Sequence, residues 1–290
     1  MLGDVDYALA GGSESMSRAP HSTQSLRTGQ KMGAVSFTDM MIGALNDPFG
    51  VGHMGVTAEN VAAENQITRE QQDAFAVESQ RRAAAAVKAG HFESQILPIE
   101  VRVKREMVPF ATDEHIKAST TMESLGKLRP AFKKDGSVTA GNASGINDGA
   151  AALVLASADA AEAAGLKPRA RLLGYAIAGV RHEVMGIGPI PAVTKLLEKI
   201  DMSADQFDVI ESNEAFAAQA CAVNAGLSLN TDKVNPNGGA IALGHPIGAT
   251  GAIISIKTLY ELERIGGKYG LVTMCIGGGQ GIALAVERLN

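Results

Sequence analysis

Hydrophobic and polar positions in the second half of the chain alternate in blocks that predict strands and helices in turn. Apolar runs predict strands at 150–156, 171–180, 207–212, 271–275 and 282–287, and periodic segments predict helices at 159–164, 191–200, 214–225 and 248–265. Strands that alternate with helices are typical of a layered α/β fold, so we expect that architecture with a largely parallel sheet. The first of these strands is a continuous apolar run and is expected to be buried.

The first half of the chain is patterned less regularly. Residues 1–12 predict a buried strand that ends in a turn at Gly11-Gly12. Residues 13–55 are irregular and rich in Gly, Ser and Met, and loops of this length inside a domain are usually functional. Residues 91–146 return to short strands and loops. We therefore expect residues 13–146 to form an insertion that covers one end of the α/β fold.

One helix in the first half has clear start and stop signals. Thr68 and Gln71 have the spacing of a capping box, in which each side chain bonds the backbone N–H of the other residue. The alanine-rich segment that follows has strong helix propensity as far as Ala89, and Gly90 is a natural residue to end it.

Composition and charge narrow the class of protein. With 290 residues, 46% of them hydrophobic and only 4% aromatic, the chain can bury a large core built from small and branched aliphatic side chains. Its net charge of −5 gives no reason to expect a nucleic-acid partner, because binding to phosphates requires clustered cations. The two cysteines form no disulfide framework, which indicates a reducing compartment and a cytoplasmic location. Neither a metal site nor a membrane span is expected, because Cys and His do not cluster at ligand spacing and apolar runs are short.

Two short segments are locally basic. They are usually solvated loop surface, and the functional alternative is contact with a ligand that carries phosphates. The residues are Arg102, Lys104, Arg105, Lys127, Arg129, Lys133 and Lys134.

Three motifs in the last third of the chain carry an amide, an imidazole and a thiol. Asn213 and Cys275 each follow or end a predicted strand, and His245 lies in the loop between those strands. Because ligands in open α/β sheets gather at the carboxyl ends of strands, these side chains are expected to converge there. Each residue also has a plain structural interpretation: Asn213 as a helix N-cap, His245 as a loop histidine bonded to backbone, and Cys275 as a buried core residue.

The glycine-rich run Gly277–Gly281 follows Cys275. A dinucleotide fingerprint must lie between a strand and a helix, whereas the next segment here is a strand, so that interpretation is weak. The glycines can instead let the backbone approach a ligand closely, with free N–H groups directed at a developing oxyanion. A plain hairpin turn is the alternative.

Three further features have less specific patterns. Cys221 lies on an apolar helix face and is interpreted as a structural residue. His53-Met54 comes just before a helix, where packing is the usual role of such a pair. The run 139–149 is rich in small polar residues and could line a ligand channel with its backbone and the Ser144 hydroxyl.

Together these motifs resemble thiolases, the family of 3-ketoacyl-CoA and acetoacetyl-CoA acyltransferases. The resemblance is greatest to bacterial biosynthetic or broad-range β-ketothiolases, and it extends over essentially the whole chain in order. The matching segments are 11–17, 53–55, 128–132, 139–149, 213–219, 244–248 and 275–281.

The resemblance implies a thiolase-like layered αβαβα fold in which the first part of the N-terminal half is missing. Residues 1–12 and 147–166 would be the remnant of the N-terminal domain. Residues 13–146 would form the CoA-binding loop domain, and residues 167–290 the C-terminal domain. The implied reaction interconverts acetyl-CoA with acetoacetyl-CoA or longer 3-ketoacyl-CoA through an acyl-cysteine. Coenzyme A would be a substrate rather than a tightly bound cofactor, and the chain would form a homotetramer or homodimer.

The same resemblance implies roles for individual residues. His245 would activate the nucleophilic cysteine and help to bind the thioester oxygen, and Asn213 would hold a water at the same oxyanion site. Cys275 would move the proton at the α-carbon of acetyl-CoA, and the Gly277 N–H would contribute to a second oxyanion site. The residues implied along the coenzyme A tunnel are His53, Met54, Lys117, Ser124, Phe132, Ala140, Ser144, Met185 and Phe216.

The nucleophile itself is where this chain departs from the family pattern. In thiolases a cysteine on a turn into a helix precedes the strand that begins here near Val5, so a missing N-terminal segment is expected. Neither Cys221 nor Cys275 fits the nucleophile position. Two other hypotheses remain. One is an inactive fragment that binds acyl-CoA without turnover. The other is a decarboxylating ketoacyl synthase, a class that favours a histidine where this chain has Cys275.

Overall fold

A computed structural model describes residues 3–289 of the chain. Residues 1 and 2 of the predicted first strand, and residue 290 of the predicted C-terminal domain, lie outside the described residues. The strands are β1 (Tyr7–Ser15), β2 (His21–Ser22), β3 (Thr38–Asp39), β4 (Asn46–Asp47), β5 (Gly52–His53), β6 (Ile99–Val103), β7 (Glu106–Phe110), β8 (Asp148–Ala156), β9 (Ala170–Gly179), β10 (Val209–Ser212), β11 (Tyr269–Ile276) and β12 (Gln280–Arg288). The α-helices are α1 (Met40–Ala44), α2 (Met54–Glu64), α3 (Arg69–Lys88), α4 (Met122–Gly126), α5 (Ala158–Ala163), α6 (Pro189–Ile200), α7 (Ala217–Gly226), α8 (Ala240–Leu243) and α9 (Ile247–Ile265).

The main sheet has four strands in the order β10-β11-β12-β9. Only β10 and β11 pair in parallel, whereas β11–β12 and β12–β9 are antiparallel. The prediction of a largely parallel sheet is therefore wrong. The physical reason is the connection between β11 and β12: it is a tight glycine hairpin, and so short a loop can join only antiparallel strands.

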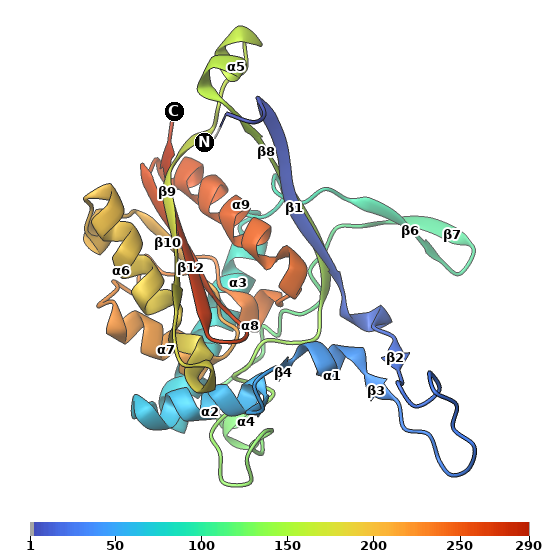
Figure 1. Ribbon diagram of the computed structural model, residues 1–290. Helices are drawn as coiled ribbons and strands as arrows, with labels where there is room; N and C mark the ends of the chain where they lie inside the picture. The colour runs from blue at the N-terminus through green and yellow to red at the C-terminus, as the bar shows by residue number, and fades with distance from the viewer. Residues whose placement is uncertain (1–2, 290) are drawn as a thin grey trace.

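Helices and sheets stack in layers around α9. Helix α6 packs on β9 and β12, while α9 packs on β10 and β11 with one side and on β1 and β8 with another. Figure 1 shows α6 and α9 on opposite faces of the main sheet, with the ribbon of β1 and β8 beyond α9. The largest core cluster lies between α6 and the sheet and includes Leu196, Phe207, Ile210 and Leu271, all of them almost fully buried. The predicted layered α/β architecture is confirmed.

Strands β1 and β8 form a separate antiparallel pair that differs from the prediction in two ways. Strand β1 does not turn at Gly11-Gly12 but continues to Ser15. A Cβ atom added at Gly12 would collide with the carbonyl oxygen of Gly248 at the start of α9, so the glycines permit close approach of strand to helix. The strands are also not buried as expected. Leu9 is 76% exposed and Val154 is 74% exposed.

The start and stop signals of the first long helix are confirmed in α3. The Thr68 N–H donates to Gln71 Oε1 at 2.7 Å, and the Gln71 N–H donates to Thr68 Oγ1 at 3.2 Å. Gly90 follows with a φ of 74°, the left-handed conformation that ends helices. The helix expected next to His53-Met54 is α2, which begins at Met54 and lies immediately before α3. Both helices pack on α7, the helix that follows β10 of the main sheet in the chain.

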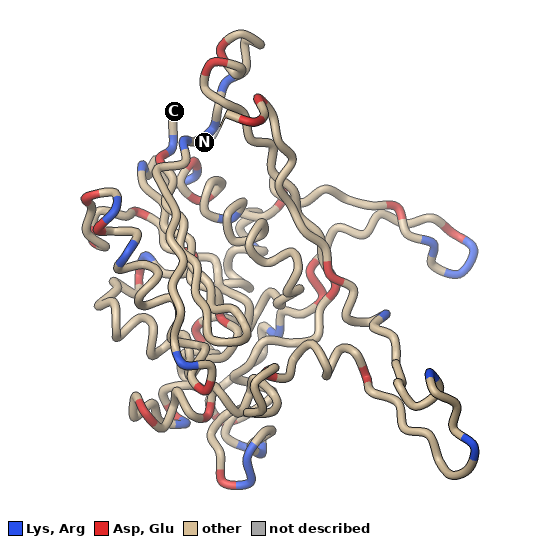
Figure 2. Tube along the Cα trace, viewed as in Figure 1, with Lys and Arg blue, Asp and Glu red and all other residues tan. Residues whose placement is uncertain are grey.

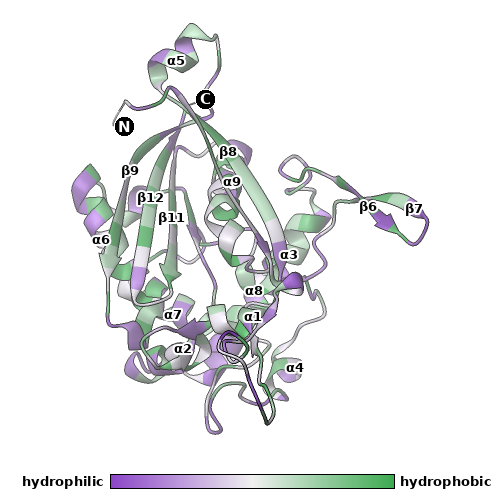
Figure 3. Cartoon of the chain, turned by 45° about the vertical axis from the view of Figure 1, so that its right-hand side comes forward, coloured by the Kyte–Doolittle hydropathy of each residue, from purple (hydrophilic) through white to green (hydrophobic). Residues whose placement is uncertain are grey.

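Two arms extend from the body of the protein. One is the β6–β7 hairpin, and the other contains β2, β3 and the chain between them. Figure 3 shows apolar and polar residues side by side on the β6–β7 hairpin. The remainder of the predicted irregular segment contains only short elements, as expected.

Candidate active site

Asn213 and Cys275 lie at the same edge of the main sheet. Ser212 is opposite Thr273 in the parallel pair β10–β11, and the Asn213 N–H donates to the Thr273 carbonyl at 3.0 Å. Cys275 is two residues further along β11, so both side chains lie at the carboxyl ends of their strands. The alternative in which Asn213 caps a helix is wrong, because α7 begins at Ala217 and its N-cap is Phe216.

His245 joins this edge through contacts to segments far apart in the chain. Its Nε2 lies 3.3 Å from Asn213 Nδ2, and its backbone N–H donates to Asn147 Oδ1 at 3.0 Å. Gly244, with a φ of 99°, makes the turn that places the histidine at the start of α9. A side chain at Gly244 would also run into Asn147.

The contacts of Thr250 favour one tautomer of His245. The Thr250 hydroxyl is placed to donate its single hydrogen to the Pro246 carbonyl at 2.9 Å, and its oxygen lies 2.7 Å from His245 Nδ1. With that hydrogen on Pro246, Nδ1 donates to Thr250, and Nε2 keeps a free lone pair that accepts from the Asn213 amide. Burial lowers the pKa of His245 to about 4, so the imidazole is neutral near neutral pH. The result is a buried base whose acceptor nitrogen faces Asn213.

Cys275 lies in an apolar cluster made by residues from both halves of the chain. The thiol is only 6% exposed, and burial raises its pKa to about 12. Four of the residues predicted to bind coenzyme A pack in the same cluster: Met54, Phe132, Met185 and Phe216. The Phe132 ring stacks on His53 at 4.7 Å and meets Phe216 edge-on at 6.0 Å.

The glycines after Cys275 form a hairpin that a side chain could not enter. Gly278 and Gly279 have φ values of 83° and 89°, which non-glycine residues rarely adopt. A Cβ atom at Gly277 would lie 2.9 Å from Met54 Cε. The hairpin-turn interpretation is therefore confirmed, whereas close approach of this loop to a ligand stays a prediction.

The other predicted ligand residues have more local partners. His53 Nδ1 accepts from the Gly55 N–H at 3.0 Å, which makes His53 the N-cap of α2, and burial lowers its pKa. The Ser144 hydroxyl donates to the Ala215 carbonyl at 3.0 Å, which fixes the run 139–149 beside Phe216. Ser124 and Lys117 are exposed: the Ser124 hydroxyl belongs to the capping box of α4, and the Lys117 backbone N–H donates to Gln80. Ala140 is exposed in its loop.

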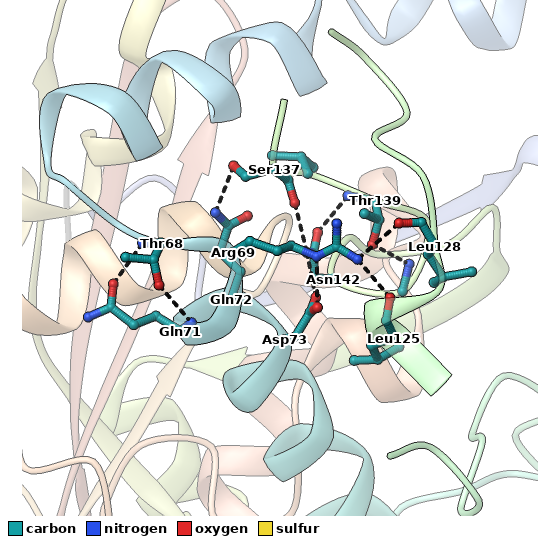
Figure 4. A network of polar contacts seen from close by, with 12 residues as sticks. Thr68, Arg69, Gln71, Gln72, Asp73, Leu125, Leu128, Ser137, Thr139 and Asn142 are labelled. Carbon is teal, nitrogen blue, oxygen red and sulfur yellow. Dashed lines mark hydrogen bonds and ion pairs between the residues drawn. The ribbon is translucent and has the colours of Figure 1, made fainter. Parts of the chain in front are cut away.

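A buried polar network anchors the run that carries Ser144. Asp73 on α3 accepts from Asn142 Nδ2 at 2.9 Å and from Arg69 Nε at 2.7 Å. The same guanidinium donates to the carbonyls of Leu125 and Leu128, as Figure 4 shows. Helix α3 therefore positions both the run 139–149 and the segment around α4.

The two basic segments lie on exposed loops. Figure 2 shows Lys and Arg at the tip of the β6–β7 hairpin and in the loop after α4, with charged residues otherwise mainly on the periphery. Both observations fit the solvated-surface interpretation and leave the contact with phosphates as a prediction.

A cavity of about 740 Å³ lies between α3 and α7, away from this site. It is lined by residues such as Phe75, Asn224 and Cys221. Cys221 is only half-buried beside it, so the interpretation as a plain core residue is incomplete. Burial raises the pKa of Cys221 to about 11.

We expect the two thiols to react slowly and in a defined order. At about pH 8, ionisation alone should slow alkylation of Cys275 on the order of a thousandfold, and that of Cys221 about a hundredfold, relative to an ordinary thiol. Mass spectrometry of iodoacetamide-treated folded protein should show labelling of Cys221 before Cys275. Protein unfolded in urea is the control, in which both should react at similar rates. Equal labelling of Cys275 in folded and unfolded protein would contradict its assigned burial.

Two site residues were not identified from the sequence. Thr250 holds the Nδ1–H of His245, and Asn147 holds its backbone N–H. The signal for Thr250 was its place in the first turn of the helix that follows the histidine. Asn147 lay within the polar run already singled out, but only the folded chain brings it to His245.

The site combines a neutral base, an amide donor and a protonated thiol at one sheet edge. The imidazole can take a proton and then present an N–H to an oxygen that gains negative charge. The thiol can exchange a proton with a neighbouring carbon. Among residues 3–289, no group of three potential metal ligands occurs. Over the same residues, every helix is too short or too polar to cross a bilayer.

Comparison with known proteins gives consistent matches along the chain. Residues 1–159 match the family model described as thiolase, N-terminal domain, and residues 166–288 match thiolase, C-terminal domain. The chain is 57% identical to the beta-ketothiolase BktB of Cupriavidus necator over 290 residues, which are 100% of this chain and 74% of that protein.

Solved structures agree. The crystal structure of the Bacillus anthracis acetyl-CoA acetyltransferase matches with a TM-score of 0.97 and 47% identity, over 99% of this chain and 73% of that one. Human mitochondrial 3-ketoacyl-CoA thiolase in complex with CoA matches with a TM-score of 0.96 and 44% identity, over 100% of this chain and 72% of that one.

Proposed function

Because this chain belongs to the thiolase family, we propose that it interconverts acetyl-CoA with acetoacetyl-CoA or a longer 3-ketoacyl-CoA. The observation that carries the proposal is the convergence of Asn213, His245 and Cys275 at one edge of the main sheet. The apolar cluster around Cys275 would accept the uncharged pantetheine and acyl part of a coenzyme A thioester.

The proposal assigns the enolate half of the reaction to these residues. Cys275 would exchange the proton of the α-carbon, and its high pKa suits a thiol that must be protonated before it meets an enolate. His245, once protonated, would donate from Nε2 to the thioester oxygen. Asn213 would hold a water at the same oxygen, and the Gly277 N–H would serve the second oxyanion site, where the hairpin leaves no room for a side chain.

Neither cysteine of this sequence is proposed as the acyl-carrying nucleophile. Cys221 borders a different cavity, and Cys275 is assigned to proton transfer. A Claisen condensation through an acyl-cysteine needs a further activated thiol. Half-reaction assays therefore test the enolate chemistry separately from full acyl transfer.

The proposed binding of coenzyme A places its two ends in different surroundings. The apolar cluster of Met54, Phe132, Met185 and Phe216 would contact the pantetheine and acyl end. The exposed Lys117 would meet the phosphates, because an ammonium on a flexible stem suits an anionic group at the surface.

Purified protein provides the test of this function. We expect calorimetry to detect coenzyme A binding. In protein that carries the activated thiol of the acyl-cysteine step, we expect an assay of acetoacetyl-CoA with coenzyme A to yield acetyl-CoA. A series of longer 3-ketoacyl-CoA thioesters would then define the chain-length preference. Binding without cleavage would support an acyl-CoA-binding protein instead, and no binding at all would overturn the proposal.

A further inference from the structure

A small cavity lies directly behind Asn213, on the side of the sheet covered by α9. Its volume is about 20 Å³, and its wall includes Glu211, Asn213, Thr250 and Lys257. A buried water needs roughly 10–15 Å³ of free space and two to four polar partners. The cavity therefore has the size of a single water site.

Glu211, Asn213 and Lys257 are brought to this cavity by simple geometry. Side chains two residues apart on a strand point to the same face, so Glu211 and Asn213 both face α9. From α9, Lys257 Nζ donates to Glu211 Oε2 at 2.7 Å and to the Gly238 carbonyl at 2.7 Å. Glu211 is 1% exposed, Asn213 2% and Lys257 5%, so these three side chains form a deeply buried polar cluster.

Some polar atoms around the cavity have no hydrogen-bond partner within the described part of the protein. Within residues 3–289, Glu211 Oε1 and Asn213 Oδ1 are buried oxygens without a protein partner. Lys257 has three N–H donors, and two of them are used by Glu211 and Gly238. Glu211 Oε1, Asn213 Oδ1 and the third N–H of Lys257 match the bonding of one water, which can donate twice and accept from the lysine. Ser212, which also lines the cavity, has a buried hydroxyl without a protein partner within the same described residues.

We propose that a buried water in this cavity links the Lys257–Glu211 pair to Asn213 Oδ1, and that the pair thereby positions the Asn213 amide for His245. With Oδ1 bonded to the water, Nδ2 is directed at the free lone pair of His245 Nε2. If the amide rotated by half a turn, Oδ1 would face Nε2, and two lone pairs would repel. The pair thus controls the orientation of Asn213 without touching the reacting groups.

The proposed link does not depend on the charge state of Glu211. Burial raises the pKa of Glu211 to about 7 although the Lys257 ammonium lowers it, so both forms are relevant near neutral pH. An ionised Glu211 accepts a hydrogen bond from the water, and a protonated one donates to it. In either case the water keeps a hydrogen for Asn213 Oδ1.

The water site is tested by a crystal structure of the unaltered protein at a resolution that shows ordered waters. We expect a density peak within hydrogen-bond distance of Lys257 Nζ, Glu211 Oε1 and Asn213 Oδ1. A peak that misses Asn213, or an empty cavity, would overturn the proposal. This crystallographic test is independent of catalysis, whereas the kinetic test that follows rests on the proposed function.

The positioning role is tested with the double variant Glu211→Leu/Lys257→Met, which removes both charges together and leaves neither unpaired. We expect its kcat for cleavage of acetoacetyl-CoA to fall roughly 10- to 100-fold with KM within about twofold, because a misplaced group acts mainly on the transition state. Glu263→Gln is the matched control. It lies on the same helix, pairs with Arg169 at the surface and should keep the original kcat. An unchanged kcat in the double variant would refute the positioning role.

Two other negative results can be told apart from a failure of the positioning role. If the unaltered protein does not cleave acetoacetyl-CoA, the proposed function fails while the crystallographic result still decides the water site. If the double variant does not fold, the side-chain amide resonances of Asn213 in the unaltered protein provide the second measurement. Slow exchange of these protons with solvent is expected for a held amide, and fast exchange would contradict it.

Discussion

Replacing Cys275 with serine is expected to abolish exchange of the α-protons of acetyl-CoA with solvent. The thiol lies in the apolar cluster with Met185 and Phe216, where a thiolate, once formed, would be strongly basic. A serine hydroxyl is a far weaker acid than a thiol, so it cannot take over proton transfer even in the same position. Positioned acid–base groups contribute typically 10²- to 10⁴-fold, and we expect a loss of at least about that size. Deuterium incorporation into the acetyl methyl group, followed by mass spectrometry, measures it.

The matched control is Cys221→Ser on α7. This residue borders the cavity between α3 and α7 and has no part in the proposed proton transfer, so exchange should continue at the original rate. Thermal unfolding of both variants would show that the fold is retained. If Cys275→Ser exchanged the protons as fast as the unaltered protein, Cys275 could not be the proton carrier.

Replacing His245 with alanine is expected to lower acyl transfer by roughly 10²- to 10⁴-fold, the usual contribution of a general base. The imidazole is neutral, its Nδ1–H is held by Thr250, and its Nε2 lone pair is free to take a proton. Alanine removes that acceptor and leaves the Asn213 amide without its partner. Steady-state rates of acetoacetyl-CoA cleavage, measured with saturating coenzyme A, give the loss in kcat.

Two further variants separate this role from a general effect of losing a histidine. His21→Ala changes an exposed histidine on β2 and should leave the rate unaltered. Thr250→Val keeps the imidazole but removes the acceptor of its Nδ1–H, so the rate should fall by less than in His245→Ala. A normal rate in His245→Ala would exclude the residue as the base.

Local signals in the sequence were sufficient for most elements of the fold. The capping box of Thr68 and Gln71, the glycine stop at Gly90 and the strand pair around the glycine loop all appear in the structure as predicted. These features depend on residues a few positions apart, whose hydrogen bonds form within one turn or hairpin. Gly11-Gly12 had the same local signature as a turn. Its real cause is the close approach of Gly248, more than 200 residues away, which no local pattern contains.

The direction of β9 in the main sheet was outside the reach of the pattern. Alternation of strands and helices favours parallel pairing, but β9 and β12 are antiparallel partners with α6, β10, α7, α8, α9 and β11 between them in the chain. The prediction that β1 and β8 are buried was also wrong, because burial depends on long-range packing. An apolar run indicates a strand, whereas its exposure depends on what packs against each face.

The chemical groups that the protein presents, and their order, can be read from the residues themselves: an amide, an imidazole and a thiol, each beside small residues at the end of an element. Their meeting depends on folding, which brings Asn213 Nδ2 to 3.3 Å from His245 Nε2 and Cys275 to the same sheet edge. Folding also sets their protonation, because burial lowers the pKa of His245 and raises that of Cys275. The residues that exclude solvent from these groups come from segments that the chain keeps far apart.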